Sequence, residues 1–317
     1  MREFQMRDFY ILKFKLILFY GKLTLGLSVF FLVSFGFHPL HAAPLKVVTT
    51  NYPLFFFSGE ILGDEIEVFN IVPPGAEVHE FIPSPKKLRS ILEADLFIYL
   101  GFNLEPWADK MRTDLKRKNI RVIKIEDFTL NDQFFKRDIQ NPDPHIWLDP
   151  LLALKLSQII YKNLVEIIPN KKDTLQRRFS VLSERLRKTH DRFVEGLTGC
   201  RNGTILTTHK AFDFLSKRYQ FKDESIYGIS TEADPTPKRI IELIKLIKKE
   251  KITIVFTEPL INDKYAEILA DETGAEMLSL HPLGSLSLEQ MTKKQDYFYF
   301  MRENLTRLRA ALDCDSK

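Results

Sequence analysis

DTLQRRFSVLSERLRKTHDRFVEGL, residues 173–197, is the stretch that decides the architecture of this 317-residue chain. Apolar residues recur in it at steps of three and four, which is the pattern of one helical face, and charged residues fill the other face. The apolar positions are Leu175, Phe179, Leu182, Leu186, His190, Phe193 and Leu197. At ~1.5 Å per residue such a helix would be roughly 37 Å long. We expect one long helix, with His190 packed on its apolar face rather than engaged in chemistry.

Alternating strand and helix patterns lie on both sides of this helix. Short runs rich in β-branched and aromatic residues predict strands. Before the helix these runs are KVVTT, IEVFNIV, LFIYL and RVIKI, and after it they are TILTT, DESIYGI, ITIVFTE and EMLSL. Strands that alternate with helices favour parallel sheets covered on both faces. The sequence therefore predicts an α/β fold with two βα lobes, 43–172 and 199–317, each with a four-stranded parallel sheet, joined by a rigid helix at 173–198.

The amino end differs from the rest of the chain. Basic residues precede an apolar run at 23–37, which is too short to span a bilayer comfortably but suits the central region of a secretory signal peptide. Small residues follow at Ala42 and Ala43. We expect residues 1–42 to be a cleavable signal peptide, with an uncleaved anchor as the alternative. Because no cysteine lies near the cut, we expect a periplasmic protein without a lipid anchor.

The charge balance argues against a nucleic-acid partner. The first 42 residues carry five of the 46 basic residues and two of the 42 acidic ones, so the remainder is nearly neutral. Runs such as KLIKKEK at 245–251 are typical of the solvated face of a helix and are not interleaved with aromatic residues. We therefore set nucleic acid aside as a partner. We also expect the protein to work as a monomer.

Four histidines occupy junctions between predicted strands and loops, two in each lobe: His79, His145, His209 and His281. Ligands of open α/β sheets bind outside the carboxyl ends of the strands, so we expect these imidazoles to converge on one site in the cleft between the lobes. Four imidazoles suit a tetrahedral divalent metal, and zinc is the first candidate. A lone histidine in such a loop would more often only pack, so their shared placement carries the prediction.

Six motifs fall in register along nearly the whole chain after residue 42: GAEVHEFIPSP, NPDPHIWLDP, LTTHKAFDFLSKRY, GISTEADPTPKRI, IVFTEP and LHPLG. Together they resemble the solute-binding proteins that deliver zinc or manganese to ABC importers. The resemblance implies two βα lobes joined by one long helix, a metal in the cleft, delivery to a permease in the inner membrane, and no enzymatic activity. It also implies that His79, His145 and His209 are metal ligands.

The resemblance bears on the choice of metal as well. A histidine at the position of His209 is similar to the zinc branch, whereas manganese members usually have a carboxylate there. Where the family commonly has an aspartate before PLG, this chain has His281, so we infer its role as the fourth ligand from its placement alone. Zinc is the expected ion, and a manganese-specific member of the same family is an alternative.

Two alternatives come from other classes of protein. A zinc hydrolase would keep three protein ligands, an open position for water, and a carboxylate such as Glu232 or Glu258 as general base. We favour hydrogen-bonding roles around the cleft for both glutamates. A surface adhesin is the other alternative, although the chain shows neither repeats nor low-complexity stalks.

The chain has two cysteines, Cys200 at the start of the second lobe and Cys314 near the carboxyl end. An exported protein meets an oxidising compartment, so we expect a disulfide between them. Two unpaired thiols are the alternative.

Overall fold

The computed structural model describes residues 45–129, 142–231 and 233–315, and the account below is confined to them. Residues Leu45–Lys317 form one compact unit. The predicted signal peptide at 1–42 lies outside the described residues, so its boundary stays a prediction. Within the described part of the chain, no helix combines the length and the apolar composition needed to cross a membrane.

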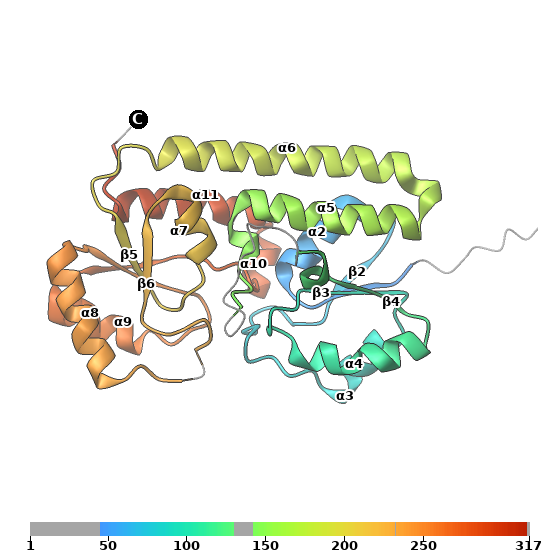
Figure 1. Ribbon diagram of the computed structural model, residues 1–317, viewed down its shortest axis with the longest axis horizontal. Helices are drawn as coiled ribbons and strands as arrows, with labels where there is room; N and C mark the ends of the chain where they lie inside the picture. Colours follow the sequence, from blue (N-terminus) through green and yellow to red (C-terminus); the bar gives the residue numbers. More distant parts are fainter. Residues whose placement is uncertain (1–44, 130–141, 232, 316–317) are drawn as a thin grey trace, which may run out of the picture. The chain divides into compact units, whose positions relative to one another are not determined.

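The first lobe is built on a four-stranded parallel sheet with the strand order β2-β1-β3-β4. Its strands are β1 (Val47–Thr49), β2 (Val68–Asn70), β3 (Leu96–Tyr99) and β4 (Arg121–Lys124). Its helices are α2 (Tyr52–Leu62), α3 (Pro85–Ile91), α4 (Pro106–Arg117) and α5 (Pro150–Ile167), with short 3-10 helices η1 (Ile125–Phe128), η3 (Ile146–Leu148) and η4 (Pro169–Lys171). Figure 1 shows α2 and α5 on one side of this sheet and α3 and α4 on the other.

Local sequence signals start two of these helices. The side chain of Asp149 accepts the backbone N–H groups of Leu151 and Leu152, and Pro150 occupies the first turn of α5. Ser84 and Pro85 start α3 in the same way. Such caps satisfy N–H groups that have no partner inside the helix, so they fix where each helix begins.

The second lobe repeats the plan, with a parallel sheet of order β6-β5-β7-β8. Its strands are β5 (Thr204–Thr207), β6 (Lys222–Ser225), β7 (Ile254–Thr257) and β8 (Glu276–Ser279). Its helices are α7 (Asp213–Tyr219), α8 (Pro237–Glu250), α9 (Lys264–Thr273), α10 (Leu288–Thr292) and α11 (Tyr297–Ala311). The prediction of two four-stranded parallel sheets is therefore confirmed.

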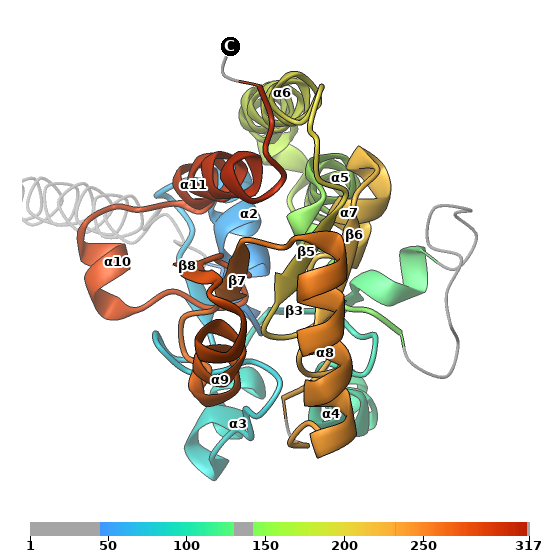
Figure 2. The same cartoon turned by 90° about the vertical axis from the view of Figure 1, so that its left-hand side faces the viewer.

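The two faces of the second sheet belong to different apolar clusters. Helices α8 and α9 lie beside each other in Figure 2 and cover one face through Leu243 and Leu269. The opposite face carries Phe256, which belongs to a larger cluster that also contains Phe97 of the first sheet. One apolar core therefore runs through both lobes, and a smaller one lies under α8 and α9.

Helix α6 (Lys172–Gly196) is the long connection expected between the lobes, and its bounds agree with the predicted 173–198 to within two residues. It packs on α5 and α2 of the first lobe and on α11 of the second, and Figure 1 shows it running along both. Leu182 and Leu186 are fully buried on its inner face. His190 is half-buried and its Nδ1 hydrogen bonds with the Tyr219 hydroxyl at 3.0 Å, as expected of a packing residue.

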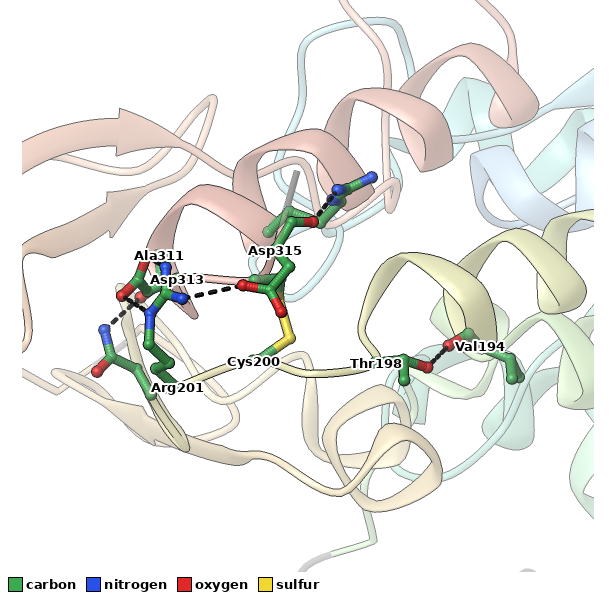
Figure 3. Close-up of a disulfide and its surroundings, with 10 residues drawn as sticks. Val194, Thr198, Cys200, Arg201, Ala311, Asp313 and Asp315 are labelled. Carbon is green, nitrogen blue, oxygen red and sulfur yellow. Dashed lines mark hydrogen bonds and ion pairs between the residues drawn. A yellow bond between two sulfur atoms is a disulfide. The ribbon is translucent and has the colours of Figure 1, made fainter. Parts of the chain in front are cut away.

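Cys200 and Cys314 are joined in a disulfide, as predicted. Figure 3 shows that this bond links the chain just after α6 to the segment that follows α11. Arg201 beside it forms ion pairs with Asp313 and Asp315. The carboxyl end is therefore tied to the start of the second lobe.

Candidate metal centre

Three of the four predicted histidines meet at one point. The Nε2 atom of His145 lies 3.0 Å from Nε2 of His79 and 3.2 Å from Nε2 of His209. In the part of the chain that the structure describes, these three residues are the group of side chains close enough together to hold a metal ion. His145 and His209 are buried, and His79 is half-buried.

The fold brings these residues together from both lobes. His79 lies in the loop between β2 and α3, and His209 follows the carboxyl end of β5. His145 precedes η3 rather than following a strand directly, which differs from the placement that we expected. Its position is fixed instead by the start of α5, because η3 leads directly into the Asp149 cap.

A carboxylate orients the ring of His145. Asp143 Oδ1 lies 2.8 Å from Nδ1 of His145 and also accepts the backbone N–H of His145 at 2.9 Å. A carboxylate at Nδ1 keeps the proton on that nitrogen, so the lone pair of Nε2 faces His79 and His209. Asp143 was not among the residues predicted from the sequence. A signal was present, because an aspartate accepts the N–H group two residues ahead in an Asx turn.

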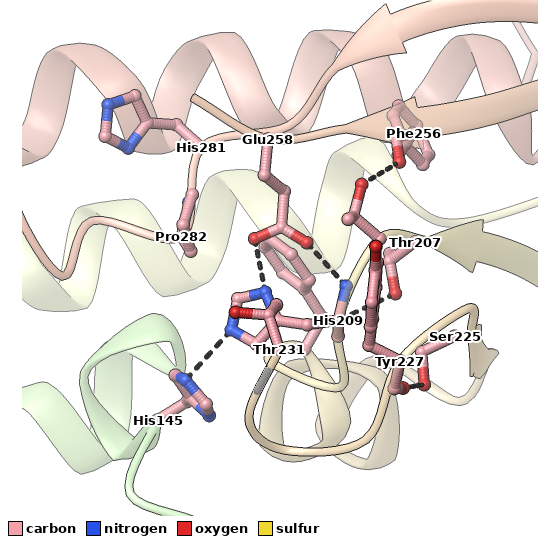
Figure 4. A network of polar contacts seen from close by, with 12 residues as sticks. His145, Thr207, His209, Ser225, Tyr227, Thr231, Phe256, Glu258, His281 and Pro282 are labelled. Carbon is pink, nitrogen blue, oxygen red and sulfur yellow. Dashed lines mark hydrogen bonds and ion pairs between the residues drawn. The ribbon is translucent and has the colours of Figure 1, made fainter. Parts of the chain in front are cut away.

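Glu258 orients the ring of His209 in the same way. Its Oε2 lies 2.6 Å from Nδ1 of His209, and its Oε1 accepts the backbone N–H of His209 at 2.9 Å. Figure 4 shows both contacts together with the approach of His209 to His145. The sheet explains the pairing: β5 and β7 are neighbours, so the residues just beyond their carboxyl ends are adjacent. Glu232 lies outside the described residues.

Burial and charge set the protonation of the three rings. Burial, together with the neighbouring imidazoles, lowers the pKa of His79 to about 2 and holds the pKa of His145 well below its usual value. Burial also lowers the pKa of His209, but the Glu258 carboxylate, helped by Glu77 and Asp223, outweighs it, so the pKa of His209 lies above its usual value. Two of the rings are therefore neutral at neutral pH, which is the form that binds metals.

The space between the rings fits one ion. The cavity is about 10 Å³ and is lined by the three histidines together with Trp147, Leu260 and His281 among others. That volume suits a single ion or water and excludes an organic ligand. Nitrogens about 2.0–2.1 Å from a tetrahedral zinc lie roughly 3.3–3.4 Å apart, close to the separations seen here.

The structure does not bring His281 into this cluster. Its Nδ1 accepts the backbone N–H of Leu283 at 3.0 Å, and its Nε2 lies 3.3 Å from the amide nitrogen of Gln290. Figure 4 shows the ring directed away from His145 and His209. Burial lowers the pKa of His281 to about 4, so the ring is neutral. Four converging imidazoles were expected, and the cluster contains three of them.

Two proteins of similar sequence are named for zinc binding and for zinc uptake. One relative is the zinc-binding lipoprotein AdcA of Streptococcus pneumoniae R6, which is 31% identical over 92% of this chain and 60% of its own length. Another is the high-affinity zinc uptake system protein ZnuA of Bacillus subtilis, which is 27% identical over 84% of this chain and 88% of its own length. The chain thus spans about 60% of the AdcA relative and most of the ZnuA relative.

The solved structures agree with the sequence relatives. The Zn(II)-bound ZnuA-like domain of Streptococcus pneumoniae AdcA is 32% identical and has a TM-score of 0.75; the match covers 86% of this chain and all of that domain. A family model described as the periplasmic component A of the zinc-uptake complex matches residues 47–311. With the match covering both lobes and all three converging histidines, this chain belongs to the family of periplasmic A components of zinc-uptake complexes.

Proposed function

We propose that this protein captures a zinc ion and delivers it to an ABC importer. The observation that carries the proposal is the convergence of three buried or half-buried Nε2 atoms on a cavity of about 10 Å³. Asp143 and Glu258 support it, because each orients one of the rings. The family supports the delivery step, since it is a component of an uptake complex.

Capture fits the site better than catalysis does. A hydrolase needs room for an organic substrate beside the metal and a carboxylate free to act as base. The cavity leaves no such room, and Glu258 contacts both the ring and the backbone of His209. We therefore assign no catalytic residue, and we assign the protein to transport rather than to enzymes.

Zinc is the proposed ion rather than manganese. All three converging groups are imidazoles, which suit zinc better than manganese, an ion that prefers carboxylate and water oxygens. The carboxylates of Asp143 and Glu258 lie behind the rings and compensate the charge of the ion without touching it. We propose His79, His145 and His209 as the ligands of the metal; His281, which the sequence suggested as the fourth, lies outside their cluster.

The proposed setting is the periplasm, and the proposed partner is the membrane permease of the importer. The basic and apolar segments before residue 43 support export through a cleavable signal peptide. The AdcA relative is named a lipoprotein. In this chain both cysteines form the disulfide and neither carries a lipid, so we propose export without a lipid anchor. We also propose that the protein works as a monomer.

Zinc titration against a chelator tests the binding step. We expect His79→Ala, His145→Ala and His209→Ala each to weaken zinc binding by at least about 100-fold, more than the loss of an outer-shell partner causes. His190→Ala is the matched control, because His190 lies on α6 and contacts Tyr219 instead of the cluster. Unchanged zinc affinity in all three variants would refute the proposed site.

Growth under zinc limitation tests the delivery step. Cells that lack the protein should regain growth in zinc-depleted medium when they are supplied with the unmodified chain or with the His190→Ala variant. The His145→Ala variant should not restore growth. If zinc binds tightly in solution but the unmodified chain restores nothing, capture stands and delivery to an importer does not.

A further inference from the structure

His281 contacts the cavity from a segment that crosses from the second lobe to the first. Residues 281–286 follow β8 and receive hydrogen bonds from three different parts of the first lobe. Trp147 Nε1 donates to the carbonyl oxygen of Pro282 at 2.7 Å. The backbone N–H of Tyr52 donates to the carbonyl oxygen of Gly284 at 3.1 Å. The backbone N–H of Gly75 donates to the carbonyl oxygen of Leu286 at 2.9 Å.

This crossing segment, residues 281–286, supports the loop that carries His79. Gly75 lies four residues before His79, and Val78 directly precedes His79. A Cβ atom added at Gly284 would lie 3.0 Å from Cγ2 of Val78, so the backbone of the segment is in close contact with the loop. The shape of the crossing segment therefore determines where His79 lies.

His281 holds the segment in that shape. Leu283 is fully buried and has a φ of 61°, a left-handed conformation that is costly for a residue with a side chain. The imidazole Nδ1 of His281 accepts the N–H of this strained residue at 3.0 Å. On its other side, His281 exchanges two backbone hydrogen bonds with the side chain of Asn304 on α11, at 2.9 and 2.8 Å, and its ring lies 4.1 Å from the ring of Phe300.

Both ring nitrogens of His281 already face N–H groups of the protein. Nδ1 accepts the backbone N–H of Leu283 at 3.0 Å, and Nε2 lies 3.3 Å from the side-chain amide nitrogen of Gln290, whose own oxygen accepts the backbone N–H of Ser287. To bind the ion through Nε2, His281 would have to leave Gln290 and turn toward the cluster. This movement would break its bond to Leu283 and, with it, the shape of the segment.

We infer that His281 is a positioning residue: it locks the crossing segment and thereby the loop of His79, and it does not supply the fourth ligand. Its contact with the N–H two residues ahead reproduces an Asx turn, in which an asparagine or aspartate oxygen makes the same bond. Nδ1 of histidine and Oδ1 of asparagine are both two bonds from Cβ. The inference rests on the proposed zinc function only for its effect on affinity.

The test compares His281→Asn with His281→Ala in the full chain. Asparagine keeps an acceptor for the Leu283 N–H and offers no imidazole, so zinc affinity should stay within about threefold of the unmodified protein. Alanine should weaken zinc binding about tenfold or more, as the loss of outer-shell partners does. Leu243→Ala is the control for general destabilisation, because Leu243 belongs to the separate core under α8 and α9. It should lower the melting temperature and leave zinc affinity unchanged.

Two further measurements make the result decisive. X-ray absorption of the zinc-loaded protein should give the same number of imidazole ligands for the unmodified chain and for His281→Asn. The NMR signal of the Trp147 indole N–H, recorded without zinc, should move in His281→Ala and stay in place in His281→Asn. The loss of one imidazole in the asparagine variant, or equal losses of affinity in both variants, would overturn the inference. Absence of zinc binding in the unmodified chain would refute the proposed function, while the indole signal would still decide the role of His281.

Discussion

Two of the three proposed ligands, His145 and His209, have a carboxylate at Nδ1 and direct Nε2 into the cluster. Asp143 contacts His145 at Nδ1 and at the backbone, so it fixes both the tautomer and the direction of the ring. We predict that Asp143→Ala weakens zinc binding about 10- to 100-fold, which is the usual effect of losing such a partner. Asp143→Asn should lose less, because its side-chain oxygen still accepts both N–H groups. Chelator titrations would measure the difference, and equal losses in both variants would contradict an orienting role.

The charge of Glu258 determines how zinc binding depends on pH. Although burial opposes it, Glu258 raises the pKa of His209 above its usual value, with smaller contributions from Glu77 and Asp223. Below that raised pKa, His209 carries a proton that zinc must displace. The affinity should therefore fall about tenfold per pH unit as the pH drops through this range.

Removing that charge should change the number of protons that zinc expels. In Glu258→Gln the pKa of His209 should fall, so less of the ring is protonated before zinc arrives and binding near neutral pH should release fewer protons. Calorimetry in buffers with different ionisation enthalpies counts these protons. The same count in both proteins would show that Glu258 does not hold His209 in its charged form.

At the scale of elements, the disulfide constrains the second lobe. It joins residues separated by 114 positions and closes the lobe from the end of α6 to the end of α11. The chain-entropy model gives about 4 to 5 kcal/mol for a loop of this size, as an upper value. We predict that replacing Cys200 and Cys314 by serine lowers the free energy of unfolding by up to that amount.

Urea unfolding of the oxidised protein and of the double variant would measure this difference. The reduced unmodified protein is the control, and it should unfold like the serine variant. Zinc affinity should be the same in all of these proteins, because no ligand lies next to either cysteine in sequence. An unchanged unfolding midpoint would contradict the prediction.

Helix starts could be predicted from the sequence, because they depend on neighbouring residues. Asp149 and Ser84 cap α5 and α3 through contacts within three positions. The long amphipathic helix could also be predicted, because its pattern lies within one continuous stretch of sequence. The role of His281 could not be predicted, since it depends on the left-handed conformation of Leu283 and on Phe300 and Asn304 of α11. Placement after a strand indicated that His281 lies near the cleft, but not where its ring points.

At the scale of the whole unit, residues 45–315, the lobes are held together along their length. One apolar cluster includes residues of both sheets, and the buried carboxylate of Asp149 on the first lobe forms an ion pair with Arg218 on α7. The Tyr297 hydroxyl on α11 donates a hydrogen bond to the carbonyl oxygen of Trp147 in η3, just before α5. These contacts, with α6, argue against wide hinge motion.

We predict that the metal-free and zinc-loaded proteins have the same radius of gyration in solution. X-ray scattering with and without excess chelator measures it directly. Arg218→Ala is the informative variant: breaking a buried ion pair on one side typically costs about 3–5 kcal/mol, so this change should loosen the lobes and lower stability. A clear contraction of the unmodified protein on zinc binding would instead show a hinge.

The small volume of the cavity also has a kinetic consequence. A dissolved zinc ion carries a shell of water that a space of about 10 Å³ cannot hold, so water must leave one molecule at a time as each nitrogen takes its place. Of the three histidines, His79 alone is not fully enclosed. We therefore expect dehydration on entry and rehydration on exit to begin at His79, and we expect movement of its loop away from the crossing segment to limit how fast a bound ion exchanges with solution.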